Sequence, residues 1–358
     1  MKKKRLPRRR VLMRASLAAI LLGVVVAGVA GVRLYLWMVL PYRNYGASST
    51  LVDVPAGTNL RAALDLLERR GVIRHIPFGA EALRVLGRGH GLRAGEYDFS
   101  RPMTPVEALD KIIAGDVFFH RVTILEGLRS DEIISQFVHS GFGSTDEFEA
   151  AFRDVSLLGT LDAQAYDLEG YLFPDTYSLA KGTTPHTIVA TMVARWRELL
   201  GTEWAQQAEK QGMTVRQAVT LASLIQRETT NPDEQRLVSS VFHNRLRVGM
   251  RLQCDPTVIY ALAMRNRYDG NIRREDLRID SLYNTYRYSG LTPGPIGNPG
   301  LAALRAAVDP VDSTYLYFVS MNTGKHYFSK SLAEHNQAVW RYQKKPFLVR
   351  PPEARSPS

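Results

Sequence analysis

The longest apolar stretch of the chain lies close to its N-terminus. Residues 15–32 carry no charged side chain, and after Arg33 an apolar segment with Tyr35 and Trp37 continues to Leu40. A run of about eighteen to twenty apolar residues is long enough for a helix to cross a bilayer, and aromatic residues are typical of its edges. The pattern therefore predicts a single membrane-spanning helix over residues 15–40.

The charges around this helix predict its orientation. Eight lysines and arginines precede residue 15, and no acidic residue occurs before Asp53. Basic residues flanking a span stay on the cytoplasmic side, so we expect residues 1–14 in the cytoplasm and the chain beyond residue 40 outside it. The alternative is a cleaved signal peptide with Gly28 and Ala30 before the cut. The apolar run is longer than a usual signal core, which favours the retained anchor.

A small α/β unit is predicted after a polar stalk at residues 41–50. Within residues 51–117, short alternating segments and segments with helical spacing follow one another. They predict strands at 51–54 and 95–99, a helix from Leu60 that ends before Gly71, and helices at 78–86 and 106–114. The last of these begins with a capping box, Thr104 to Glu107, and has proline at its first helical position.

Residues 118–345 predict a larger and mainly helical domain. The pattern predicts a strand at 122–125, helices at 130–137, 185–200 and 214–229, and helix starts capped by Ser130, Asn231, Asp255 and Asn298. Near the end, YLYFVS and KHYFS flank the turn 321–324 and predict a β-hairpin. The proline-rich tail 346–358 predicts disorder. The expected fold class is therefore α+β.

Composition excludes several kinds of site. The net charge of +11 falls to +3 without the first fourteen residues, so it gives no reason to expect a nucleic-acid partner. The single cysteine, Cys254, excludes an internal disulfide, and the eight histidines lack a zinc-binding spacing. The chain contains no phosphate-binding loop, dinucleotide fingerprint or serine-nucleophile elbow. We therefore expect no metal site and no cofactor.

One carboxylate occupies an unusual position. Apolar residues at Ala218, Leu221, Ala222 and Ile225 form the buried stripe of a helix, and the stripe continues at Glu228. Burial and the negative end of the helix dipole both raise the pKa of a carboxyl group, as a general acid near pH 7 requires. Alternatively, Glu228 turns to the rim and pairs with Arg227 or Arg245.

Glu228 belongs to one of five segments that carry a resemblance to a known family. The segments are EGYLFPDTY (169–177), LASLIQRET (221–229), VSSVFHNRLRVGMRLQCDPTVIYAL (238–262), YNTYRYSGLTPGPIGNP (283–299) and YLYFVSMNTGKHYFSKSLAEHN (315–336). In this order they resemble the endolytic murein transglycosylases, the YceG-like or MltG family. The resemblance implies a LysM-like subdomain at 51–117 and a YceG-like catalytic domain at 118–345.

The resemblance also implies site residues. Glu228 matches the single catalytic glutamate of the family. The chain departs from the family at Gln226, where a second glutamate is common, and at Cys254, where serine or threonine is usual. Provisional substrate-binding residues are Gln253, Asp255, Asn284, Tyr286, His335 and Tyr171, the last for stacking on sugar rings, as Tyr283 and Phe173 could also do.

The function implied is endolytic cleavage of the bond between MurNAc and GlcNAc in nascent peptidoglycan strands. The muramic acid C6 hydroxyl would attack, leaving 1,6-anhydro-MurNAc ends and terminating glycan elongation. The implied location is the bacterial inner membrane with the catalytic domain outside the cytoplasm, and cell-wall synthases are the implied partners. Two alternatives stay open: a non-catalytic glycan-binding scaffold, and a hydrolysing muramidase that uses Asp233, Glu234 or Asp255 as a second acid.

Overall fold

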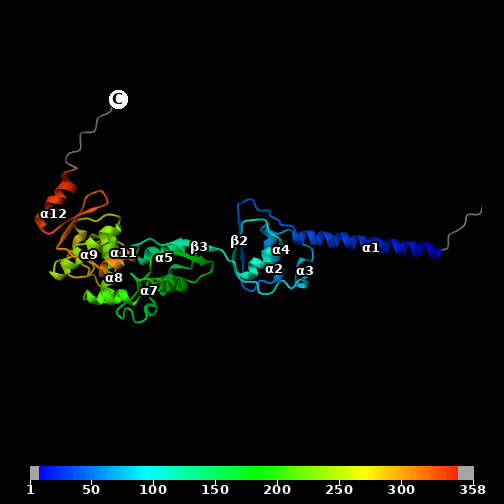
Figure 1. Ribbon diagram of the computed structural model, residues 1–358, viewed down its shortest axis with the longest axis horizontal. Coiled ribbons are helices and arrows are strands. Elements are labelled where there is room, and N and C mark those ends of the chain that lie inside the picture. Colours follow the sequence, from blue (N-terminus) through cyan, green and yellow to red (C-terminus); the bar gives the residue numbers. More distant parts are fainter. Residues whose placement is uncertain (1–7, 346–358) are drawn as a thin grey trace, which may run out of the picture. The chain divides into compact units, whose positions relative to one another are not determined.

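The computed structural model describes residues 8–345 (Figure 1). It consists of two compact units that divide after His120, with residues 180–182 returning to the first. Helices predominate, and the described residues form three two-stranded sheets, β1–β2, β3–β4 and β5–β6. The predicted α+β class with a long N-terminal apolar helix and a C-terminal hairpin is confirmed.

The first helix is apolar over most of its length. Helix α1 (Arg8–Val39) contains the segment Leu12–Val39, in which the mean hydropathy reaches 2.4 over an 18-residue window that the protein leaves unburied. The helix begins earlier than the predicted residue 15, because arginine is a good helix former and the basic residues from 8 to 14 continue the same helix. Its length and composition are those of a membrane span or a signal anchor.

The first unit is a short sheet covered by helices. The elements are β1 (Thr50–Val54), α2 (Leu60–Arg69), α3 (Gly79–Val85), β2 (Gly95–Phe99) and α4 (Pro105–Ala114). Strands β1 and β2 pair antiparallel with Val52 opposite Tyr97, and both side chains are buried. The capping box between Thr104 and Glu107 is present as predicted.

Residues 41–50, which the sequence predicts to be a stalk, make contacts with this unit. Tyr42 forms a β-bridge with Met103, and the backbone N–H of Asn44 donates to the carbonyl of Gly71. Met38, in the last turn of α1, is itself part of the core of the unit. No free spacer therefore separates the apolar helix from the folded unit.

The second unit contains the remaining elements. They are β3 (Phe119–Thr123), α5 (Ser130–His139), α6 (Thr145–Phe152), β4 (Thr176–Ala180), α7 (Pro185–Lys210), α8 (Val215–Glu228), α9 (Pro232–Arg247), α10 (Asp255–Ala263), α11 (Leu301–Val308), β5 (Tyr317–Ser320), β6 (His326–Ser329) and α12 (Leu332–Val339). Short helical turns occur at 155–158, 276–278 and 340–344. The strand expected at 122–125 lies three residues earlier, and the predicted hairpin is confirmed by the antiparallel pairing of β5 with β6.

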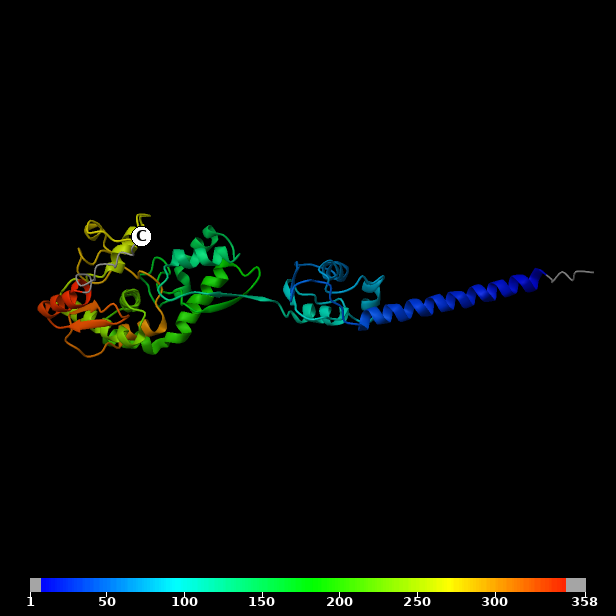
Figure 2. The same ribbon diagram turned by 90° about the horizontal axis from the view of Figure 1, so that it is seen from above.

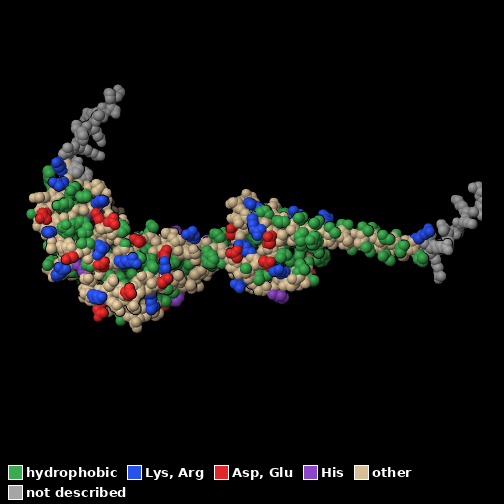
Figure 3. Space-filling view, viewed as in Figure 1, with side chains coloured by type: hydrophobic (Ala, Val, Ile, Leu, Met, Phe, Trp, Pro, Cys, Tyr) green, Lys and Arg blue, Asp and Glu red, His purple; other side chains and the backbone are tan. Residues whose placement is uncertain are grey.

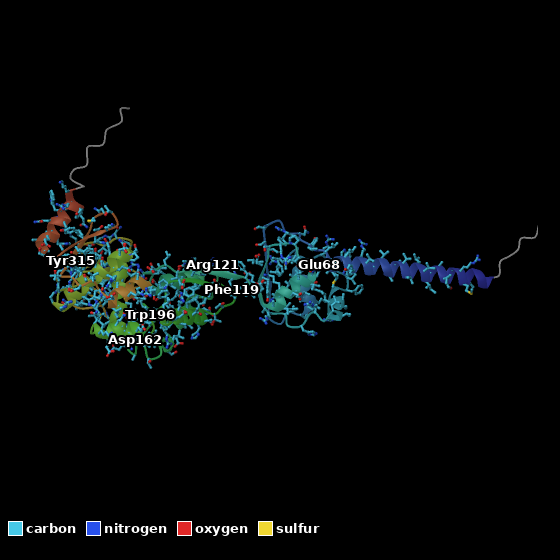
Figure 4. All side chains as sticks on the ribbon, viewed as in Figure 1. Glu68, Phe119, Arg121, Asp162, Trp196 and Tyr315 are labelled. Atoms are coloured by element: carbon cyan, nitrogen blue, oxygen red, sulfur yellow. The ribbon has the colours of Figure 1, made fainter. Side chains whose placement is uncertain are left out.

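Helix α8 lies at the centre of this unit. It packs against α7, α9, α10 and α11, and every residue from 218 to 226 is buried (Figures 1 and 2). Its contact with α11 is the most extensive between two helices, because α11 presents the small side chains of Ala303, Ala306 and Ala307. On α7, Trp196 packs between the rings of Tyr171 and Trp204 (Figure 4). The carboxyl end of α8 is thus fixed by a large core.

Three of the predicted helix caps are wrong. Helix α5 begins at Ser130 and its cap position is Arg129, whereas α10 and α11 have Cys254 and Gly300 at their cap positions. Asp255 is therefore the first residue of α10. Ser130 and Asn298 are buried and bind Glu169 instead: the Ser130 hydroxyl donates to Oε1 at 2.9 Å, and the Asn298 amide donates to the same oxygen at 2.9 Å. By contrast, Asn231 caps α9 as predicted.

Candidate active site

Glu228 is the last residue of α8, where the buried stripe of the helix meets solvent. The helix starts with a capping box between Thr214 and Gln217, and it ends because Thr229 adopts an extended conformation. Pro232 follows three residues later at the start of α9. The stripe from Ala218 to Ile225 is buried as predicted, and Glu228 is partly buried. The carboxyl group is therefore held at the edge of the core.

The thiol of Cys254 is a hydrogen-bond partner of the Glu228 side chain. Burial and the charge of Glu228 raise the pKa of this thiol well above its usual value, so the thiol keeps its proton and donates. The Cys254 backbone is held on both sides: its N–H donates to the Thr285 hydroxyl at 3.0 Å, and its carbonyl accepts from the Thr257 hydroxyl at 2.7 Å. The loop around Thr285 thus fixes the donor that faces Glu228.

The surroundings raise the pKa of Glu228 to about 7. Burial is the main cause, and the negative charge of Asp255 adds to it, while the thiol of Cys254 and the positive charges of His326 and Arg245 act in the opposite direction. The predicted direction is confirmed, and burial, one of the two predicted causes, is the main one. Near neutral pH the carboxyl group is thus divided between its protonated and ionised forms, which suits a residue that first gives and then takes a proton.

Arg245 places a positive charge near this carboxyl group without forming a salt bridge. Among the described residues, no carboxylate lies within 4 Å of its guanidinium, so the rim pairing of Glu228 with Arg245 is absent. The buried guanidinium donates from Nε to the Leu316 carbonyl at 2.7 Å and from Nη1 to the Leu252 carbonyl at 2.6 Å. Its Cζ lies 5.3 Å from the centroid of the Tyr317 ring. Arg227 donates to the Gly127 carbonyl instead.

The hairpin supplies His326, whose charge, when the ring is protonated, acts on Glu228. Both the backbone N–H and Nδ1 of His326 bind Glu234, at 2.8 and 2.7 Å, and both side chains are largely buried. Glu234 therefore neutralises and orients the imidazole, in addition to standing in the first turn of α9 as predicted. Sequence reasoning missed His326 and considered Arg245 only as a pairing partner of Glu228 at the rim, although both lie in segments that carry the family resemblance.

Several of the predicted binding residues lie around Glu228. Asp255 is exposed and accepts a hydrogen bond from the Tyr286 hydroxyl at 2.5 Å. The charge of Glu228 also contributes to a raised pKa of Tyr286, which places both partners near the carboxyl group. Gln253 is exposed in the left-handed region, with φ of 49°, and its N–H donates to the Thr285 carbonyl. These three residues form one polar border of the site.

The other predicted binding residues have different surroundings. The ring of His335 stacks on Tyr317 at 5.2 Å, on the same tyrosine that Arg245 contacts. Asn284 is fully buried, and its amide donates to the carbonyls of Leu277 and Ile279. Asn284 therefore shapes the loop and offers no surface to a sugar.

Tyr171 lies away from Glu228, in the core. It is fully buried, packs on Trp196, and donates from its hydroxyl to Asp162 at 2.7 Å. Trp196 and Asp162 are labelled in Figure 4. Asp162 also forms a buried salt bridge with Arg216 at 3.1 Å. Because the ring has no exposed face, the expected stacking of Tyr171 on a sugar does not agree with its position. Phe173 and Tyr283 are also buried.

Gln226, the other departure from the family pattern, is part of the packing between α8 and α11. It is buried, and its Oε1 accepts the backbone N–H of Gly300 at 3.1 Å, at the cap position of α11. The amide nitrogen Nε2 has no hydrogen-bond partner. Gln226 therefore joins two helices and adds no charge beside Glu228.

Comparison with known proteins agrees with these observations. Residues 52–341 match the YceG-like family. The chain is 30% identical over 318 residues to a Bacillus subtilis protein named endolytic murein transglycosylase, covering 84% of this chain and 87% of that protein. A Streptococcus pneumoniae protein of the same name is 28% identical over 348 residues, which cover 87% of this chain and 62% of that longer protein.

A solved structure is also similar. The crystal structure of a YceG-like protein from Listeria monocytogenes has 31% sequence identity and a TM-score of 0.56, and the match covers 81% of this chain and 98% of that chain. The family match extends from the first strand of the small unit to the end of the helical unit, and it includes Glu228 and all the groups that surround it. The chain therefore belongs to the YceG-like family.

Proposed function

We propose that this protein is a membrane-anchored lytic transglycosylase that cuts peptidoglycan strands internally at the bond between MurNAc and GlcNAc. The observation that carries the proposal is a single partly buried carboxyl group, Glu228, whose pKa is raised to about 7 in a family that contains endolytic murein transglycosylases. The strands cut would be newly made ones, so that cleavage terminates elongation.

The reaction needs one carboxyl group in two protonation states. Protonated Glu228 donates its proton to the glycosidic oxygen as the bond from that oxygen to C1 of MurNAc breaks. The resulting carboxylate then accepts the proton of the MurNAc C6 hydroxyl while its oxygen bonds to C1, which leaves a 1,6-anhydro end and restores the acid. Water is not consumed. Because the attacking C6 hydroxyl belongs to the same sugar as C1, it is already held close to C1, and no second catalytic group from the protein is needed.

The groups around Glu228 suit this cycle. Burial holds the proton on Glu228 before cleavage, whereas the thiol of Cys254 and the charges of Arg245 and His326 stabilise the carboxylate that forms afterwards. Neither cation sits within salt-bridge distance of Glu228 in the described part of the chain, so neither one removes its proton outright. Gln253, Asp255 and Tyr286 form the border at which we place the glycan.

The products distinguish this function from its alternatives. Mass spectrometry of purified peptidoglycan after incubation with the protein should find new chain ends that are 1,6-anhydro-MurNAc, each lighter than a reducing end by one water. A hydrolysing muramidase, for which Asp255 would have to serve as the second acid, would give reducing ends. A binding scaffold would give no new ends, and either of these results would contradict the proposal.

Cys254 provides a test of how the proton of Glu228 is controlled. A hydroxyl is a stronger donor than a thiol, so Cys254→Ser should lower the pKa of Glu228, whereas Cys254→Ala removes the donor and should raise it. Because cleavage requires the protonated acid, the alkaline limb of the pH–rate profile should move to lower pH in the serine variant and to higher pH in the alanine variant. Shifts in the same direction, or none, would show that the thiol does not tune Glu228.

The rest of the chain is consistent with an enzyme acting at the membrane surface. We propose that α1 is retained as a single-pass anchor in the bacterial inner membrane with residues beyond it outside the cytoplasm. The order β1, α2, α3, β2 with antiparallel pairing supports a LysM-like role in binding glycan for the first unit. Cell-wall synthases, which extrude the strands, are the proposed partners.

A further inference from the structure

The distance between the bilayer and the first unit is set by α1. Eighteen uncharged residues separate Arg14 from Arg33, about 27 Å of helix at about 1.5 Å per residue, close to the thickness of a hydrocarbon core of about 30 Å. Arg33 lies 5.6 Å from the Trp37 ring, as expected for a pair at the interface. Since Met38 already belongs to the core of the first unit, that unit begins at the level of the lipid headgroups.

The loop before α3 lies beside the end of the anchor. The Gly71 carbonyl accepts the backbone N–H of Asn44 at 2.8 Å, and the guanidinium of Arg74 lies 4.9 Å from the Tyr42 ring. Tyr42 and Asn44 follow α1 by only three and five residues. Both ribbon views show α3 at the end of the unit where α1 enters it (Figures 1 and 2). The segment 71–86 therefore faces the membrane.

This segment exposes large apolar side chains. Phe78, Val85 and Leu86, which we name the α3 patch, are 79%, 88% and 60% exposed, whereas Ala80 and Leu83 on the opposite side of α3 are buried. Apolar side chains gather on the first unit where α1 joins it (Figure 3). Single exposed apolar residues are common on soluble proteins, but a cluster on one short helix marks an interaction surface.

The backbone of Phe78 supports the same interpretation. Its φ of 59° and ψ of 20° lie in the left-handed region, which is sterically unfavourable for a bulky residue. Within the first unit this strain turns the ring away from the core that Leu67 and Leu83 form. This strained conformation, which exposes an aromatic ring, has an explanation if another molecule covers the Phe78 ring.

The charges around the α3 patch are compatible with phospholipid. Two nearby acidic groups are paired, Glu81 with Arg61 and Glu68 with His75, and Asp65 is exposed without a salt bridge among residues 8–345. Arg74 and Arg84 are exposed and form no salt bridge with any carboxylate in the same range, so the arginines outnumber the unpaired acid. Arginines that lack a carboxylate partner and lie beside exposed apolar side chains are typical of segments in the interface of a membrane with anionic lipid.

We propose that the α3 patch inserts into the outer phospholipid surface beside its own anchor, so that the first unit is held against the membrane by two attachments. The proposal rests on α1 being a retained membrane span. The patch enters the headgroup region, with Phe78, Val85 and Leu86 at the boundary between headgroups and acyl chains and with Arg74 and Arg84 at the phosphates. The first unit then has a fixed orientation above the bilayer.

Site-directed fluorescence on the full-length protein tests this. Cys254 is buried, so a single new cysteine can be labelled with a fluorophore in the variants Val85→Cys, Val29→Cys and Asp53→Cys. Val29 lies in α1, and Asp53 is exposed on β1 opposite Glu96, which binds His120 where the chain leaves the unit. Each labelled protein is reconstituted in nanodiscs of phosphatidylethanolamine and phosphatidylglycerol, with and without nitroxide-bearing lipid.

The three positions separate the possible outcomes. The label at position 85 should lose about half of its fluorescence to the nitroxide lipid, because side chains of interfacial helices lie about 5–10 Å deep, whereas the label at position 53 should keep its fluorescence. If position 29 is quenched and position 85 behaves like position 53, the patch does not dock. If the label at position 29 is not quenched, the proposal that α1 is a membrane anchor is wrong. A label at 85 that responds only to added soluble glycan fragments would assign the patch to glycan and overturn the proposal.

Discussion

Glu228→Gln is expected to lower the rate of glycan cleavage by about 10³-fold or more while the protein stays folded, since an acid–base group contributes about 10²–10⁴-fold and this one would act in both halves of the reaction. Glutamine has the size of glutamate and can accept the hydrogen bond of the Cys254 thiol, but it has no proton to give at neutral pH. Anhydro ends released per minute from purified peptidoglycan measure the effect.

The control for this substitution is Glu209→Gln, which neutralises an exposed acid on α7. It should leave the rate unchanged. In the unsubstituted protein the rate should fall as the pH rises through about 7, because deprotonation of Glu228 removes the acid. The catalytic assignment would be wrong if the Glu228→Gln variant kept a substantial rate of cleavage. It would also be wrong if the loss of rate were fully explained by a loss of folded protein.

Asn298→Ala is expected to destabilise the second unit by about 3–5 kcal/mol, since each buried polar group left without a partner costs about 1–3 kcal/mol. The side-chain oxygen Oδ1 of Asn298 accepts hydrogen bonds from the backbone N–H groups of Gly170 and Leu172 at 3.0 and 2.9 Å. Its amide donates to Glu169 and to the Leu128 carbonyl. Alanine would leave both backbone N–H groups and one carboxyl oxygen of Glu169 with fewer partners.

The change in stability can be measured by urea unfolding followed by tryptophan fluorescence, since Trp196 and Trp204 lie in the core of this unit. Asn271→Ala is the matched control, because Asn271 is exposed and its side chain makes no hydrogen bond within the described residues. It should change the midpoint little. Equal midpoints for the two variants would show that the hydrogen bonds of Asn298 are replaced by water after substitution.

Local patterns were sufficient to predict most of the helices and the hairpin. The stripe that leads to Glu228, the capping box of α4 and the turn between β5 and β6 each depend on residues within a few positions of one another. The same local interpretation was wrong for Asp255 and Asn298. A polar residue before proline is usually a cap, but the Asn298 side chain binds Glu169, 129 positions away.

The groups that tune Glu228 could not be predicted for the same reason. The contact of Arg245 with the Leu316 carbonyl joins positions 71 apart, and that of His326 with Glu234 joins positions 92 apart. No spacing or periodicity in one sequence predicts such contacts. The position of Tyr171 shows the opposite error, because an aromatic side chain in a family segment can be retained for core packing with Trp196.

The hairpin of β5 and β6 is hydrogen-bonded to both ends of α9. His326 on β6 binds Glu234 in the first turn of that helix, and the carbonyl of Leu316, just before β5, binds Arg245 in its last turn. The hairpin follows both α8 and α9 in the order of the chain. A chain that is still growing, or one cut short before residue 315, would have the acid of α8 but neither neighbouring cation in place. The proposed activity of Glu228 would therefore depend on the hairpin being folded against α9.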